Sequence, residues 1–376
     1  MKAVWIGGVF SEYALENYRA VNQAQNRWSL GLIQSLSDLG WSFHSLAFRA
    51  EQLWPKGVLR PGKDEDFHSS VTPLLVPTWN LPFIRKRSLP RAYLRKFKQH
   101  ISKEGKPDIV ISYNPLPWHL SAAKFAAKEL NIPWISITLD LKYPGKNMEH
   151  FCALNQQASG QVILSWWGFE NCPLEPKLHL DGGYDQLHPN DADYSEDTKK
   201  IILYSGKYTD YGGNDLLVDT IMACKRSDVE FWLLGKGENA RINALSREDP
   251  RVRRMGFVSN AELDQCCRKA HVFLNPRPNA FADNLMTYPS KLLFYMAFGK
   301  PIISTWTPGL SPEYRSLFEI PMREDGVGFA RSIDSLLANS SFERSYLRER
   351  MFAFLKASRS WKVQAHRLNE FAQKLK

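Results

Sequence analysis

The chain of 376 residues has few cysteines and no long apolar run. No stretch reaches the ~18 consecutive apolar residues that a membrane span needs. The apolar part of the first residues, MKAVWIGGVFSEY, is too short for a signal peptide and is typical of a first strand. The five cysteines are odd in number and lack metal-type spacing, so we expect free thiols in a reducing, cytoplasmic compartment. They are Cys152, Cys172, Cys224, Cys266 and Cys267.

Several common catalytic motifs are also missing. The sequence contains no Walker loop, no HExxH motif and no recognisable serine–histidine–acid arrangement. The carboxylates Asp140, Glu262 and Asp283 do not form the close acidic pair typical of a metal site. We therefore expect neither a bound metal nor a cofactor.

Acidic residues are absent from residues 71–100, although the chain carries a net charge of +10. Aromatic residues Trp79, Phe83, Tyr93 and Phe97 lie among the cations of this segment. Basic residues mixed with aromatics suit an anionic membrane surface or a nucleic acid, and a solvated helix face is the third interpretation. We favour a membrane surface bound through residues 79–98, with no nucleic acid as a partner. The cations are Arg85, Lys86, Arg87, Arg91, Arg95, Lys96 and Lys98.

Apolar strands and helical patterns alternate along the whole chain. Residues 188–200, HPNDADYSEDTKK, are polar, acidic and without apolar periodicity, which is typical of a linker between domains. Alternation on both sides of this linker predicts an α/β protein with two Rossmann-like domains facing across a cleft. We place the domains at residues 1–190 and 191–356. The predicted strands are 2–7, 41–48, 108–113, 133–139 and 161–165, then 201–205, 229–234, 252–258, 271–275 and 301–304.

Residues 357–376 have helical spacing of apolar side chains from Trp361 to Leu375. This helix either packs on its own domain or returns to the first one. The sequence by itself does not separate the two arrangements.

Residues 275–305, NPRPNAFADNLMTYPSKLLFYMAFGKPIIST, form a strand, a polar loop, a short apolar helix and a second strand. Pro289 suits a first helical position, and Gly299 suits the position after a helix end. Free N–H groups at the helix start, beside Lys291, would bind a phosphate or a diphosphate. An ordinary strand–helix–strand crossover with a polar loop remains the alternative. The polar loop residues are Arg277, Asn279, Asp283, Asn284, Ser290 and Lys291.

The segment PSKLLFYMAFGKPIIST resembles the donor-binding segment of family-4 glycosyltransferases with the GT-B fold, in particular the bacterial polysaccharide enzymes. The resemblance covers about residues 200–310 and implies that this region holds the diphosphate of a nucleotide-sugar. It also implies that the last helix, residues 357–376, crosses back to the first domain. The chain departs from the family at Met286 and Phe294, where members usually carry two glutamates, of which the second binds the donor ribose.

The same resemblance assigns further residues. Lys207 matches the first of two cations that clamp the donor diphosphate in the family, whereas Gly212 stands where the second is expected. Phe257 follows a strand whose end contacts the base; it packs either on that base or in the core. The expected catalytic residues are Lys207, Lys291 and Asp140, of which Asp140 would contact the acceptor or cap a helix. The expected donor-binding residues are Gly206, Lys207, Gly235, Gly237, Phe257, Arg277, Asn279, Asn284, Ser290, Lys291 and Leu292.

The sequence thus predicts a GT-B glycosyltransferase that acts without a metal. It would move a sugar from a nucleotide-sugar to a polysaccharide or lipid-linked saccharide acceptor, as in bacterial surface polysaccharide synthesis. Most of the family retains the anomeric configuration, and this is the expectation here. The alternative is a non-catalytic binding or scaffold protein on a decayed glycosyltransferase fold, and the substitutions at Gly212, Met286 and Phe294 favour it. The expected location is cytoplasmic, with peripheral contact to the inner membrane face.

Overall fold

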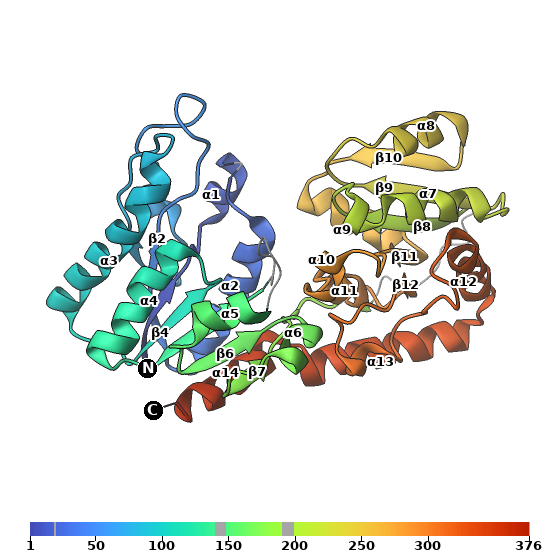
Figure 1. Ribbon diagram of the computed structural model, residues 1–376. Helices are drawn as coiled ribbons and strands as arrows, with labels where there is room; N and C mark the ends of the chain where they lie inside the picture. Colours follow the sequence, from blue (N-terminus) through green and yellow to red (C-terminus); the bar gives the residue numbers. More distant parts are fainter. Residues whose placement is uncertain (19, 140–147, 190–198, 376) are drawn as a thin grey trace. The chain divides into compact units, whose positions relative to one another are not determined.

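The computed structural model describes residues 1–18, 20–139, 148–189 and 199–375, and it divides into two compact units (Figure 1). The first unit contains Met1–Leu164, Gly168–Gly183 and Ser360–Lys376. The second contains Ser165–Trp167 and Tyr184–Arg359. Each unit has its own parallel sheet with helices packed on it, so the predicted α/β fold class is confirmed.

The first unit is built on a sheet of seven strands in the order β3-β2-β1-β4-β5-β6-β7. Each neighbouring pair is parallel. The strands β1, β4 and β5 are fully buried or nearly so, as expected for a parallel sheet covered on both faces. Two strands at the sheet edges, β3 and β7, were not predicted. The strands are β1 (Lys2–Ile6), β2 (Ser42–Ala47), β3 (Thr72–Leu75), β4 (Ile109–Tyr113), β5 (Trp134–Thr138), β6 (Gly160–Ile163) and β7 (Lys177–His179).

Helices α1 (Glu12–Asn17), α2 (Gln23–Asp38), α3 (Ile84–Glu104), α4 (Pro117–Leu130) and α5 (Met148–Asn155) belong to this unit, and α6 (Trp166–Asn171) begins at its boundary. The last helix, α14 (Trp361–Gln373), also lies in the first unit. Its Trp361 ring meets the Trp28 ring of α2 edge-on, with centroids 5.9 Å apart. Its Asn369 Oδ1 accepts a hydrogen bond from Trp41 Nε1 at 2.9 Å.

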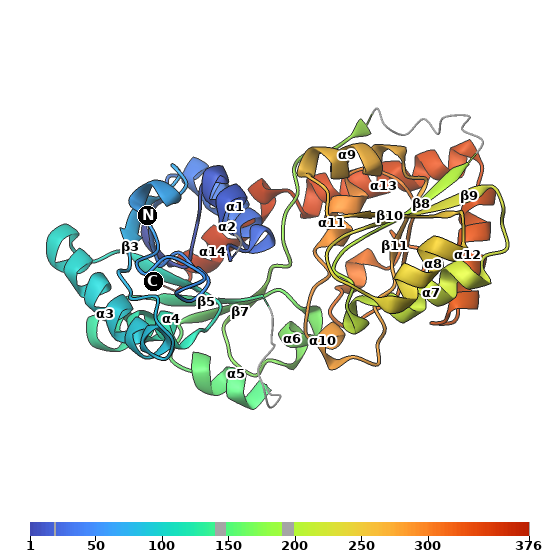
Figure 2. The same cartoon turned by 90° about the horizontal axis from the view of Figure 1, so that it is seen from above.

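The second unit has a five-stranded parallel sheet in the order β10-β9-β8-β11-β12. Helices lie on both faces of this sheet (Figure 2). The strands are β8 (Lys200–Ser205), β9 (Val229–Leu234), β10 (Val252–Gly256), β11 (Val272–Asn275) and β12 (Ile302–Ser304). The helices are α7 (Asn214–Ala223), α8 (Ala240–Glu248), α9 (Asn260–Lys269), α10 (Ala282–Leu285), α11 (Lys291–Met296), α12 (Gly326–Ala338) and α13 (Ser341–Ser358).

Within each sheet all strands are parallel, so the loops that follow the strands gather at one edge of that sheet. In open α/β sheets this edge is where ligands bind. Across the described residues, no helix is both long and apolar enough to cross a membrane.

Candidate donor-binding site

Three glycine-bearing loops meet at the carboxyl edge of the second sheet. Gly206 N–H donates to Leu234 O at 2.9 Å, and Gly235 N–H donates to Gly256 O at 2.7 Å. Gly235 has a φ of +150°, and a methyl group built on it would lie 1.6 Å from Gly206 O. Only glycine fits this close approach of two backbones. The predicted residues Gly206 and Gly235 are therefore brought together, and Gly237 follows with a φ of +119°.

Lys291 extends from the start of α11 to the same place. Its Nζ lies 4.4 Å from the centroid of the Tyr204 ring, and a methyl group built on Gly206 would come within 2.9 Å of it. The side chain as a whole is only partly buried, but its ammonium end lies inside, against the tyrosine ring. The structure therefore brings Lys291 to Gly206, which is 85 positions earlier in the sequence.

The electrostatics of Lys291 are unusual for a lysine. Burial, with a smaller contribution from the nearby Arg277 cation, lowers the pKa of its ammonium from 10.5 to about 7. Over the described ranges, no carboxylate and no hydrogen-bond acceptor pairs with this ammonium. The group is thus a partly desolvated cation beside a second cation. An anion bound there would relieve both the burial cost and the repulsion.

Arg277 and Asn284 form the polar wall of the site. Arg277 Nε donates to Asn284 Oδ1 at 2.9 Å, and its guanidinium also donates to Thr287 Oγ1 at 2.9 Å. The Asn284 amide in turn donates to Tyr211 O and Pro278 O, so it joins the loop after β8 to the loop after β11. Asn284 is fully buried. It orients the arginine and holds the two loops together.

Three predicted residues, Asn279, Leu292 and Ser290, have their amide or backbone N–H groups engaged within the protein. The Asn279 amide donates to Glu324 and to Trp306 O, so this side chain is already engaged. Leu292 is fully buried, and its N–H donates to Pro289 O. Ser290 is exposed, and its N–H donates to Tyr288 O. Lys207 is exposed at the rim, and Asp140 lies outside the described residues.

The start of α11 consequently has fewer free N–H donors for an anion than the sequence predicted. The helix has only six residues, and two N–H groups around its start, those of Ser290 and Leu292, already have backbone partners. A short helix whose first donors are engaged contributes little dipole or hydrogen bonding to an anion. The positive charge of the site comes from Lys291 and Arg277 rather than from the helix.

Phe257 is not a core residue, and that interpretation of the sequence is wrong. Phe257 is 61 % exposed. The Lys236 ammonium lies 3.7 Å from the ring centroid. Because β10 ends at Gly256, the next side chain leaves the sheet and stands in solvent at the carboxyl edge. Phe257 and Lys236 together offer an apolar face and a cation on the loops after β9 and β10.

The two positions of the missing glutamates are apolar in structure as well as in sequence. Phe294 is partly buried and contacts the rings of Tyr184, Tyr295 and Phe298, with centroids 6.0, 6.1 and 5.2 Å away. Met286 is likewise partly buried, in the turn after α10. Aromatic rings at these distances stabilise the fold by packing. The phenyl ring at position 294 has no oxygen that could accept a hydrogen bond from a ribose hydroxyl.

The sequence analysis missed two tyrosines that hold the loop after β8. The Tyr204 hydroxyl donates to Lys207 O at 3.1 Å. The Tyr295 hydroxyl accepts from Ser205 N–H at 2.9 Å and donates to Ser205 O at 3.3 Å. Both tyrosines are buried, and burial raises the pKa of each hydroxyl above its usual value. The only sequence signal for this role was a tyrosine inside an apolar strand or helix. Such a tyrosine is expected to be buried, and a buried tyrosine hydroxyl usually has a hydrogen-bond partner.

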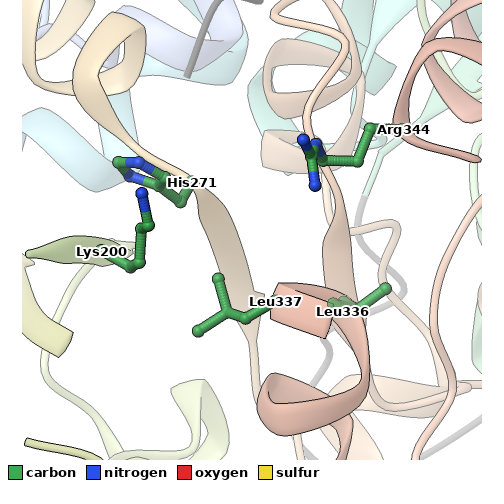
Figure 3. Close-up of a pocket in the computed structure, with 5 residues that line it drawn as sticks. All are labelled: Lys200, His271, Leu336, Leu337 and Arg344. Atoms are coloured by element: carbon green, nitrogen blue, oxygen red, sulfur yellow. The ribbon is translucent and has the colours of Figure 1, made fainter. Parts of the chain in front are cut away.

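A small cavity of about 60 Å³ lies at the opposite edge of the same sheet (Figure 3). Lys200 opens β8 and His271 precedes β11, so these residues stand at the amino ends of the strands. Figure 3 shows the Lys200 ammonium beside the His271 ring, with Arg344 across the opening. This cavity is separate from the glycine loops. Within the described ranges, no group of three His, Cys, Asp or Glu side chains could hold a metal ion.

Comparison with known proteins agrees with this geometry. Residues 199–339 match the family model described as "Glycosyl transferases group 1". Sucrose-phosphate synthase from Thermosynechococcus elongatus has a similar structure, with a TM-score of 0.72 and 15% identity, over 100% of this chain and 99% of that one. HepE from Anabaena, solved in complex with UDP, gives a TM-score of 0.70 and 12% identity over 100% of both chains.

The lipopolysaccharide outer core galactosyltransferase WaaB is also similar, with a TM-score of 0.65 and 15% identity, over 100% of this chain and 99% of that one. At these identities the likeness shows the fold, which is GT-B. No curated protein matches the chain.

Proposed function

The chain is a group 1 glycosyltransferase with the GT-B fold, and from this premise we propose that it transfers a sugar from a nucleoside-diphosphate sugar to a saccharide acceptor. The acceptor would be a polysaccharide or a lipid-linked saccharide, as in the synthesis of bacterial surface polysaccharides. Two similar structures support this class of reaction. HepE was solved with UDP-glucose, and WaaB is a lipopolysaccharide galactosyltransferase.

One observation carries the proposal: the Lys291 ammonium is held inside the loops after β8 and β11 with a lowered pKa and no carboxylate partner among the described residues. A diphosphate supplies the missing negative charge. Lys207 stands exposed on the adjacent loop and adds a second cation that reaches the ligand as a point charge.

The same two lysines can assist the chemistry. Breaking the bond between the sugar and the diphosphate leaves negative charge on the departing phosphate oxygens. Cations positioned before the reaction stabilise that charge as it develops, and this electrostatic effect needs no metal. We assign Lys291 and Lys207 to this role, with Arg277 and Asn284 fixing the loop around them. Retention of the anomeric configuration is the family expectation that we carry forward.

The alternative function is donor binding without catalysis. The observation that favours it is the apolar environment of Phe294, which lies among aromatic rings where the family usually has a glutamate. The two functions differ in turnover. A transferase releases nucleoside diphosphate in proportion to acceptor consumed, and a binding protein releases none.

We also propose that the first unit binds the cytoplasmic face of an anionic membrane through residues 79–98 and the loop after β2. Helix α3 buries Tyr93 and Phe97 in the core, so these two aromatics do not face a membrane. Trp79 and Phe83 are exposed, and so are Leu53, Trp54, Val58 and Leu59 of the loop. Among the cations of this segment, Lys86, Arg87, Arg91, Arg95 and Lys98 are exposed.

Asn80 joins these two segments into one surface. Its amide donates to Gln52 O at 2.5 Å and to Val58 O at 2.8 Å. The Arg85 guanidinium donates to Asn80 Oδ1 and to Glu51 O, both at 2.6 Å. Arg85 is therefore a structural residue of the surface, whereas the sequence had placed it among the membrane-contacting cations.

Turnover of the donor tests the proposed function. Release of nucleoside diphosphate is measured with UDP-, GDP- and dTDP-sugars and a panel of saccharide acceptors. Lys291→Ala should lower turnover at least tenfold while the protein stays folded, because a hydrogen bond to a charged group is worth roughly 1.5–3 kcal/mol. Lys269→Ala, an exposed lysine of α9, is the charge-matched control. Equal turnover in both folded variants would rule out the role of Lys291.

A further inference from the structure

The ring of Tyr204 lies against the ammonium of Lys291. The Lys291 Nζ is 4.4 Å from the centroid of this ring. Tyr204 belongs to β8 and is 1 % exposed, so the ring lies inside the second unit. The face of an aromatic ring carries partial negative charge and attracts an ammonium, and the attraction is stronger where water is excluded. Tyr204 therefore interacts with the charge of the proposed donor site as well as with the core.

Neighbouring groups hold the ring in this place. The Tyr204 hydroxyl donates to Lys207 O at 3.1 Å, which ties the ring to the loop after β8. The Tyr208 ring stacks with it at 6.2 Å and an interplanar angle of 20°. A methyl group built on Gly206 would lie 3.0 Å from the Tyr204 hydroxyl oxygen and 2.9 Å from Lys291 Nζ. Glycine at this position thus leaves room for the ring and the ammonium together.

The charged and titratable groups around this pair come from three segments of the second unit. They are Arg277 from the loop after β11, Tyr204, Lys207, Tyr208 and Tyr211 from β8 and the loop after it, and Tyr295 from α11. Arginine, tyrosine and an exposed lysine keep the same charge between pH 6 and pH 8. Burial raises the pKa of the Tyr204, Tyr208 and Tyr295 hydroxyls further. Lys291, with its pKa of about 7, is the group of this set whose charge changes in that range.

We propose that Tyr204 is a positioning residue of the donor site: its ring keeps the Lys291 ammonium charged and in place to meet the donor diphosphate. Burial and the Arg277 cation both favour loss of the lysine proton. The ring face opposes both, because it attracts the protonated form and not the neutral amine. That the anion is the diphosphate of a nucleotide-sugar rests on the proposed function. The effect of the ring on the ammonium does not.

NMR of the full chain tests this effect without any ligand. The lysines are isotope-labelled, the Nζ signal of Lys291 is assigned by its loss in Lys291→Arg, and its shift is followed from pH 5 to pH 9. Tyr204→Leu removes the ring and should lower the pKa of Lys291 by about one unit. Phe231→Leu is the matched control, because it removes a fully buried ring from the same core, on the neighbouring strand β9. It should leave the pKa of Lys291 unchanged.

Two further replacements of Tyr204 keep the shape of the ring and so test its charge distribution even if Tyr204→Leu does not fold. Tyr204→Phe keeps the negative face and should leave the pKa of Lys291 close to that of the wild type. Trifluorophenylalanine at the same position has the same ring, but its fluorines withdraw charge from the face. It should lower the pKa of Lys291 below the value in Tyr204→Phe.

The pH dependence of donor binding gives a second readout. If the pKa of Lys291 falls from about 7 to about 6, the Kd for UDP-glucose should exceed that of the wild type about twofold at pH 6 and about tenfold at pH 8. A ring that served only to fill the core would change the Kd by the same factor at both pH values. Calorimetric titration of Tyr204→Leu and the wild type measures the two ratios.

Three outcomes would overturn this inference. They are equal pKa values of Lys291 in the Tyr204→Phe and trifluorophenylalanine proteins, an equal fall of the pKa in Phe231→Leu and Tyr204→Leu, or a Kd ratio that does not change between pH 6 and pH 8. The proposed function fails separately. If the pKa of Lys291 depends on the ring as expected but the wild type binds no nucleotide-sugar, the ring still acts on the ammonium and the donor assignment is refuted.

Discussion

At the scale of single residues, Lys291 is the group whose ionisation should be visible in binding. Its pKa of about 7 in the free protein lies well below the 10.5 of an ordinary lysine. An anionic donor favours the protonated form, so binding raises this pKa and takes up a proton. As the pH rises above about 7, the free protein loses the ammonium, and donor affinity must fall.

We therefore predict that the Kd for UDP-glucose rises by up to about tenfold per pH unit between pH 7 and pH 9. Calorimetric titration at several pH values measures it, and UDP-glucose suits the purpose because its diphosphate is a diester. Lys291→Arg should flatten the curve, since arginine keeps its proton over this range. A wild-type affinity that does not change with pH would show that the lysine does not contact the donor.

Phe294 tests whether the missing glutamate leaves an open site or a packed one. Its ring contacts three other aromatic rings, so Phe294→Glu would place a carboxylate among them without a partner. A buried carboxylate without a partner lowers the free energy of unfolding by about 1–3 kcal/mol. We predict a lower melting temperature and no gain in donor affinity, with Phe294→Leu as the milder control. An unchanged melting temperature together with tighter UDP-glucose binding would show that the site is open.

The sequence predicted part of this site and missed another part for an identifiable reason. Arg277, Asn284 and Lys291 could be predicted because loops after parallel strands meet at one edge. Asn279 stands in the same loop, yet its amide bonds with Glu324 and Trp306 O. Glu324 is 45 positions away in the sequence, and no local pattern shows which side chain a distant segment will engage.

At the scale of elements, the buried strands were the most predictable features. The predicted strands 2–7, 108–113 and 229–234 are present as β1, β4 and β9. They could be predicted because runs of Val, Ile and Leu are typical of strands buried in a parallel sheet. The edge strands β3 and β7 have four and three residues, and β3 contains a proline, so their signal was weak. Helix α11 is present as the short helix that the sequence predicted, but its engaged N–H groups could not be predicted from its residues.

Helix α3 and the loop after β2 give a prediction at this scale. The exposed cations Lys86, Arg87 and Arg91, with the apolar side chains beside them, should bind vesicles that contain anionic lipid. Each cation contributes about 1 kcal/mol at best, and the attraction fades beyond a Debye length of roughly 8–10 Å. Sedimentation with anionic vesicles should therefore weaken steeply as salt is added.

The triple substitution of Lys86, Arg87 and Arg91 by Ser should reduce vesicle binding, with Arg85 left intact because it holds the loop. A matched control replaces three exposed cations of the second unit, Lys225, Lys269 and Arg331, by Ser. Equal sedimentation with neutral vesicles, or none with either kind, would remove the membrane from the account and leave a soluble acceptor.

At the scale of the whole molecule, the chain combines the GT-B fold with a proposed donor site that departs from the family pattern. The GT-B fold extends over both units, as the similar structures with 12–15% identity show. Glycine is required at position 235, because a methyl group there would lie 1.6 Å from Gly206 O. The family glutamates and the second clamp cation are replaced, and the cation pair Lys291 and Arg277 remains. The central claim is that this remainder still binds a nucleoside-diphosphate sugar.

Thermal unfolding of the full chain with UDP-, GDP- and dTDP-sugars tests that claim most directly. The account predicts that one of them, at a hundredfold excess over its Kd, stabilises the protein by about 2.7 kcal/mol. The same ligand should give little or no shift with Lys291→Ala and a full shift with Lys269→Ala. A folded wild-type protein that responds to none of these donors, or an Lys291→Ala variant that responds as fully as the wild type, would contradict it.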